Sequence, residues 1–173
     1  MQQPILNLSS WSVEDVEAHM AGLSRGQELE RVRVVAQTRV YRSTEPREVR
    51  LRWARLALAA NERFHDNTPW AQARMCHQEF SLRSWVIEHL GPDADPDWNP
   101  QALATDTLAA LPLDPHLAGS LARGWRELPI EQIGTLRRCK NLTAHVDRLM
   151  LHLPPGLIRD QLEAWASVRE NLP

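Results

Sequence analysis

The sequence predicts an all-α protein, an irregular bundle of about seven to eight helices folded as a single domain over residues 1–173. Glycine is scarce, with 7 residues, whereas alanine and leucine are abundant, and this composition favours helices over a sheet with many tight turns. Apolar residues recur every three or four positions in several segments, as in helices that bury one face. Prolines also follow a capping residue at three expected helix starts, Thr68-Pro69, Asn99-Pro100 and Asp114-Pro115. A chain of this length can bury a core of its own without disulfides.

Three helices are expected in the first part of the chain, over 12–23, 26–43 and 46–65. Ser12 and Asp15 have the spacing of a capping box at the start of the first. The second alternates arginine and valine in a way that would suit a strand, but the sequence offers no partner strand, so we predict a helix. The third has the clearest helical stripe, formed by Val49, Trp53, Leu56, Ala60 and Phe64.

The next segment, 69–90, is expected to be a helix that ends at Gly91-Pro92. A break near Ser81 would instead give a helix-turn-helix motif, although the usual glycine of the turn is missing. An acidic loop with two prolines follows at 91–99 and is the candidate boundary between subdomains. After it we expect helices over 100–111, 115–127, 129–152 (with a candidate break at Asn141) and 155–172.

Cysteine usage and hydropathy indicate a cytoplasmic protein. Cys76 and Cys139 are far apart and form no CxxC pattern, so a disulfide framework is not expected. The first 20 residues lack the basic and long apolar regions of a signal peptide. The apolar runs are much shorter than the roughly 20 residues that cross a membrane, so no membrane association is expected.

The residues from Trp11 to Leu23, WSVEDVEAHMAGL, resemble the opening helix of a sterile-alpha-motif domain. The sequence that follows does not resemble the later helices of that family. No activity, partner or site residue is therefore transferred from it.

No catalytic or metal site and no cofactor are predicted. The sequence has no Gly-x-Ser-x-Gly motif, phosphate-binding loop or dinucleotide fingerprint. Glu62 and His65 form a Glu-x-x-His, half of a helical di-iron site, but no second copy is present. His145 and His152 would lie about 10.5 Å apart along a helix, too far to share one zinc ion.

The arginines give the strongest functional signal. Nine arginines and four glutamates lie between residues 25 and 56, so that segment carries +5 while the whole chain carries −2. On a helix, Arg31, Arg39 and Arg42 fall within about 80° of one another and could follow a phosphate backbone. Arg52 and Arg55 extend this candidate nucleic-acid-binding face. The alternative is a solvated helix pair whose arginines bridge neighbouring glutamates at i,i+3 and i,i+4 spacing.

Two tryptophans are candidate protein contacts, because Trp11 lies near the N-terminus and Trp98 in the acidic loop. The alternative is that each ring folds back and covers the edge of the core. The function predicted from these features is a non-catalytic accessory subunit of a larger assembly. Its arginines would contact the backbone of DNA or RNA, and its tryptophans would contact protein partners. The first alternative is a protein-interaction module (an adaptor, inhibitor or immunity-type protein) without a nucleic-acid role. The second is a metal-dependent enzyme.

Overall fold

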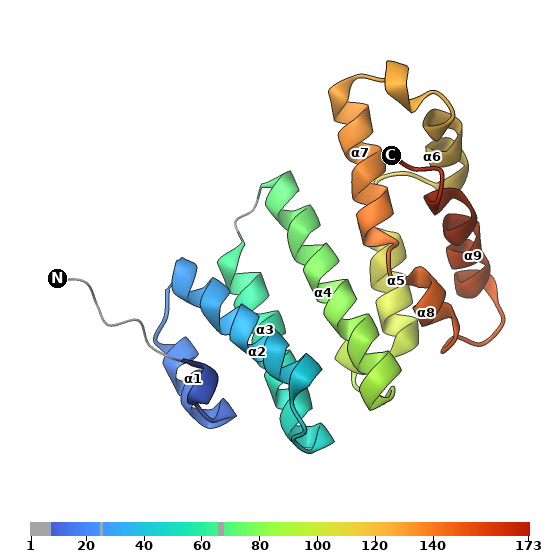
Figure 1. Ribbon diagram of the computed structural model, residues 1–173. Coiled ribbons are helices and arrows are strands. Elements are labelled where there is room, and N and C mark those ends of the chain that lie inside the picture. The colour runs from blue at the N-terminus through green and yellow to red at the C-terminus, as the bar shows by residue number, and fades with distance from the viewer. Residues whose placement is uncertain (1–7, 25, 66–67) are drawn as a thin grey trace. The chain divides into compact units, whose positions relative to one another are not determined.

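The computed structural model describes residues 8–24, 26–65 and 68–173 (Figure 1). These residues form α-helices and short 3-10 helices without any strand, so the all-α prediction is confirmed, and 26–43 is helical. In chain order the elements are η1 Leu8–Ser10, α1 Val13–Ala21, α2 Gln27–Arg42, α3 Arg47–Phe64, α4 Pro69–Leu90, η2 Pro96–Trp98, α5 Pro100–Ala110, α6 Pro115–Ala122, η3 Trp125–Glu127, α7 Ile130–Leu142, α8 Val146–Met150 and α9 Leu157–Arg169.

The chain divides into two compact units, an N-terminal unit of Met1–Met75 and a C-terminal unit of Cys76–Pro173. The division falls inside α4, which is one continuous helix. The acidic loop at 91–99, expected as a candidate boundary, lies within the C-terminal unit. Because α4 passes Ser81 without a break, the helix-turn-helix interpretation of this segment is wrong.

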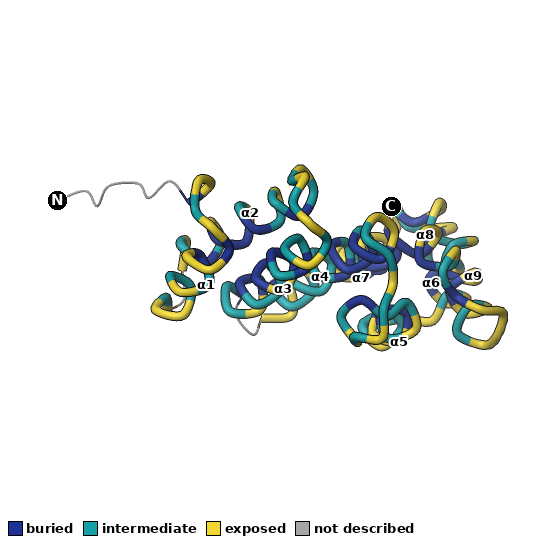
Figure 2. The backbone as a smooth tube through the Cα atoms, turned by 90° about the horizontal axis from the view of Figure 1, so that it is seen from below, coloured by how far each residue is buried: buried dark blue, intermediate teal, exposed yellow. Residues whose placement is uncertain are grey.

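Helices α2 and α3 lie side by side and form the core of the N-terminal unit (Figure 1). One stripe of α3 is buried, as the dark segments of Figure 2 show, and it includes Trp53, Leu56 and Ala60 of the predicted stripe. Val49 and Phe64, at the two ends of that stripe, are half-buried. Helix α1 adds the buried side chains of two valines to this unit, Val13 and Val16.

Helix α9 joins two apolar clusters in the C-terminal unit. Its Leu162 packs in a cluster with α4, α5 and α8, whereas its Trp165 packs in a second cluster with α6 and α7. A Cβ atom on Gly119 of α6 would lie 3.1 Å from Val168 of α9, so glycine allows these two helices to approach closely. The close approach explains why an otherwise unfavourable helix residue stands in the middle of α6.

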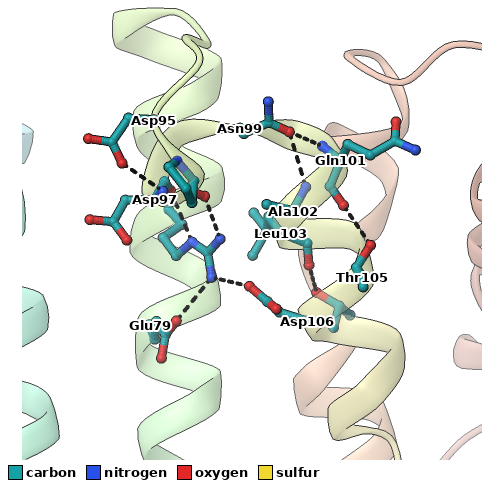
Figure 3. Close-up of polar contacts among 12 residues, drawn as sticks. Glu79, Asp95, Asp97, Asn99, Gln101, Ala102, Leu103, Thr105 and Asp106 are labelled. Carbon is teal, nitrogen blue, oxygen red and sulfur yellow. Dashed lines mark hydrogen bonds and ion pairs between the residues drawn. The ribbon is translucent and has the colours of Figure 1, made fainter.

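Helix boundaries follow the local signals in the sequence. The side chain of Asn99 accepts hydrogen bonds from the backbone of Gln101 and Ala102 at the start of α5 (Figure 3). Asp114 caps α6 in the same manner, and Ser12 forms the predicted capping box with Asp15. Two expected helices are divided: 115–127 becomes α6 and η3, and 129–152 becomes α7 and α8.

None of the helices in the described ranges combines the length and the apolar character that a membrane span requires.

Candidate functional site

Two arginines of α2 form ion pairs within their own helix. Arg31 donates to Glu28 at 2.6 Å, and both side chains are largely exposed. Arg33 is buried and forms a two-pronged contact with Glu30 at 2.7 Å, which lowers the pKa of that carboxyl. Both pairs have the i,i+3 spacing of the solvated-helix alternative, and such pairs stabilise a helix by about 0.2–0.5 kcal/mol each.

Arg39 connects α2 to the segment before α1. Its Nη2 donates to the backbone oxygen of Ser9 at 2.8 Å and to that of Trp11 at 3.3 Å. The guanidinium also lies 5.5 Å from the ring centre of Trp53, within the range of a cation–π contact. This side chain is therefore engaged by protein groups and is not presented to solvent for a phosphate.

Arg52 connects α3 to α1 through two acidic residues. It donates to Glu17 at 2.7 Å and to Glu14, and these hydrogen bonds raise the pKa of the guanidinium, with Glu17 as the larger cause. Arg63 contributes a similar link, because it donates to the backbone oxygens of Met20, in the last turn of α1, and of Leu23, which follows it. The arginines of α3 thus hold α1 through its carboxylates and its last carbonyls.

The remaining two predicted phosphate contacts lie on the surface. Arg42 is exposed, and its side chain makes no hydrogen bond or ion pair with any residue that the structure describes. Arg55 is also exposed and has an interaction within the protein. The five candidate arginines therefore do not form one free cationic stripe. Arg31, Arg39 and Arg52 instead donate hydrogen bonds to carboxylates and backbone carbonyls of the fold.

The two candidate tryptophans have different environments. Trp98 is fully buried in the C-terminal unit, as in the alternative in which its ring folds back onto the core. A ring buried in this way does not present a surface to a partner protein. Trp11 is half-buried in the N-terminal unit.

Trp11 lines a shallow, open pocket of about 430 Å³ together with Asp15, Ala18 and His19 of α1. The rings of Trp11 and His19 meet edge-on, with centroids 5.5 Å apart and planes at 81°. The backbone on both sides of Trp11 is fixed, because its N–H donates to Leu8 and its carbonyl accepts from Arg39. Asp15 was expected only as a capping residue, and His19 was not predicted, because Trp11 lies before α1 and no helical periodicity connects it to His19.

A buried arginine organises the acidic loop of the C-terminal unit (Figure 3). Arg83 of α4 donates to the backbone oxygens of Asp97 at 3.0 Å and Pro96 at 2.9 Å. The same guanidinium contacts Glu79 at 3.0 Å and Asp106 at 2.8 Å. Burial raises the pKa of Glu79, and Arg83 opposes that shift. The guanidinium of Arg83 therefore contacts only groups of the fold, and it connects α4 to the acidic loop and to Asp106 of α5.

The two cysteines and the buried His145 are poorly suited to nucleophilic chemistry. Burial raises the pKa of Cys139 to about 11 and also raises the pKa of Cys76, so both hold their protons at neutral pH. Burial lowers the pKa of His145 to about 3. In the part of the chain that the structure describes, no three His, Cys, Asp or Glu side chains gather as ligands of one metal ion. Glu62 is exposed and His65 is buried at the end of α3.

No family model, curated protein or solved structure matches this chain. Its function therefore has to be inferred from the side chains described above.

Proposed function

We propose that this chain is a non-catalytic helical binding protein that recognises a protein partner, as an adaptor, inhibitor or immunity-type protein does. The proposal rests on a set of large apolar side chains that are exposed to solvent. Trp70, Ile130, Leu151 and Leu157 are 71%, 72%, 80% and 73% exposed. Leu151 and Leu157 lie on either side of an exposed Pro-Pro-Gly segment, with the buried Leu153 between them in the sequence. Surfaces of this kind mark sites where another protein excludes water.

The arrangement of the arginines favours a protein partner over a phosphate backbone. Nucleic-acid affinity without sequence specificity requires several cations that are free to replace counterions. Arg39 and Arg52 instead hold the N-terminal unit together, and Arg31 is paired with Glu28. An exposed Trp70, with the Arg74 guanidinium 5.7 Å from its ring centre, has the residue types that dominate protein-binding hot spots.

The test compares nucleic-acid binding with protein binding by the same purified chain. Binding to single- and double-stranded DNA and RNA is measured against salt concentration, and partners captured from a lysate are produced separately and titrated back. We expect no salt-dependent nucleic-acid affinity and a purified partner whose binding survives nuclease treatment. A slope of log K against log salt near −3 or steeper, reduced by Arg42→Glu, would refute the proposal in favour of phosphate contact. Arg42 is the residue to change because its replacement breaks no contact between described residues.

A further inference from the structure

The pocket beside α1 combines an aromatic wall with an acidic group that the fold leaves unneutralised. Helix α1 carries three acids in its first turns, Glu14, Asp15 and Glu17. Arg52 pairs with both Glu14 and Glu17, whereas Asp15 forms no ion pair with a described residue. Asp15 is therefore the acid of these three whose carboxylate has no cationic partner within the described part of the fold.

The carboxylate of Asp15 is oriented by the capping box. Its Oδ2 accepts from the Ser12 hydroxyl at 2.7 Å and lies 3.4 Å from the Ser12 backbone nitrogen. Its Oδ1 accepts no hydrogen bond from the described residues, so one oxygen remains for a ligand. The carboxylate is thus held in place before any ligand arrives, which lowers the entropic cost of binding.

The aromatic wall is held in place as well. The backbone of Trp11 is fixed by Leu8 and Arg39, and its ring is supported by the edge-on contact with His19. A planar cation is attracted to the face of a tryptophan and, when it is a guanidinium, also pairs with a carboxylate through a fork of N–H donors. The open pocket of about 430 Å³ admits a side chain of this length from solvent.

From this geometry we propose that the Trp11 pocket receives an arginine side chain of the protein partner, stacked on Trp11 and paired with Asp15. The inference rests on the proposed protein-binding function and assigns its partner a basic, arginine-bearing segment. A lysine would satisfy the charge of Asp15 but would lose the planar stacking, so arginine is the residue that fits both groups.

The experiment titrates the full chain with a blocked Gly-Arg-Gly peptide and follows the backbone and indole N–H signals by NMR. The matched probe is the same peptide with citrulline, which keeps the shape of arginine and removes its charge. We expect saturable shifts at Trp11, Asp15, Ala18 and His19 with the arginine peptide and at least tenfold weaker binding of the citrulline peptide. Equal responses to the two peptides, or no saturable shift, would overturn the proposal.

Two variants separate the pocket from general electrostatics. Asp15→Asn removes the charge while its amide oxygen can still accept from Ser12, and it should weaken binding of the arginine peptide at least tenfold. Ala18→Arg places a competing guanidinium one helical turn from Asp15 and should block the pocket without touching the capping box. Glu62→Gln removes one exposed charge of the same unit and should leave the affinity unchanged. A loss with Glu62→Gln equal to that with Asp15→Asn would overturn the assignment to this pocket.

The same variants distinguish failure of this inference from failure of the proposed function. If a purified partner binds the wild-type chain and the Asp15→Asn chain equally, the pocket assignment is wrong and the protein-binding function stands. If no protein partner binds and nucleic acid does, the proposed function itself is wrong. Circular dichroism and the thermal midpoint of each variant show whether α1 remains folded.

Discussion

Protonation of a single buried histidine should make the C-terminal unit sensitive to acid. His145 is 4% exposed, and its Nε2 lies 3.0 Å from the hydroxyl oxygen of Thr107. That hydroxyl donates to the backbone oxygen of Leu103 at 2.8 Å, so the imidazole Nε2 donates to the hydroxyl and carries the proton. The other ring nitrogen, Nδ1, is buried with no hydrogen-bond partner. A second proton would therefore place an uncompensated charge and an unpaired N–H in the core.

The direction of the pH effect follows from the lowered pKa. Burial is the main cause of the shift, and the positive charges of His77, Arg83, Arg148 and Arg169 add to it. The unfolded chain binds a proton at His145 below its ordinary pKa of 6.5, whereas the folded chain does so only near 3. Stability from this group is complete above pH 6.5 and is lost as the pH falls toward 3. At about 1.36 kcal/mol per pH unit, the loss is about 2 kcal/mol near pH 5.

Urea unfolding of wild-type protein and of a His145→Gln variant at pH values near 7.5 and near 5 tests this reasoning. The glutamine amide can still donate to Thr107 but does not titrate. We expect the drop in unfolding free energy between the two pH values to be about 2 kcal/mol smaller in the variant than in wild type. His116→Gln, at an exposed histidine, is the control and should behave as wild type. Equal drops in wild type and His145→Gln would refute the assignment of acid sensitivity to this side chain.

Three further outcomes follow from the contacts described above. Arg83→Met should lower the unfolding free energy by about 3–5 kcal/mol in urea titration, because it leaves Glu79 and two loop carbonyls without their buried partner. A loss below about 1 kcal/mol would contradict the conclusion that Arg83 holds the acidic loop on α4. Trp98→Ala should cost about 3–5 kcal/mol by the same measurement because it opens a cavity, whereas Trp70→Ala should stay within about 0.5 kcal/mol because that side chain is exposed. Arg52→Gln should speed hydrogen exchange of the α1 amides relative to those of α3, and unchanged exchange would show that the apolar contacts of α1 suffice.

The helices could be predicted because their signals are local. Ser12, Asn99 and Asp114 each accept hydrogen bonds from backbone groups two or three residues away, so the sequence window around them contains the whole interaction. The buried stripe of α3 is local in the same sense, since a helix places every third or fourth residue on one face. This is why the predicted helix starts at the capped positions agree with the structure, whereas the expected helices over 115–127 and 129–152 are each divided.

The pairs of Arg31 and Arg33 are local, but the roles of Arg39 and Arg52 could not be predicted because their partners are distant in sequence. Arg39 contacts carbonyl oxygens 28 and 30 residues away, and Arg52 contacts acids 35 and 38 residues away. The helical stripe places their Cα atoms correctly, but a long flexible side chain can turn toward any acceptor within its reach. The count of charges therefore indicated an exposed cationic face, whereas in the fold the guanidinium groups of Arg39 and Arg52 connect α2 and α3 to α1 and the segment before it.

The use of arginine as the nearly universal cation of this chain leaves one lysine, Lys140. Its ammonium donates to the backbone oxygen of Leu172 at 2.6 Å, beyond the end of α9. Apart from the α-amino group, a reagent that acylates amines therefore has a single target on the chain. Because Lys140 is exposed, it would be labelled in the folded protein, and acylation would neutralise the ammonium that donates to Leu172 without an engineered probe.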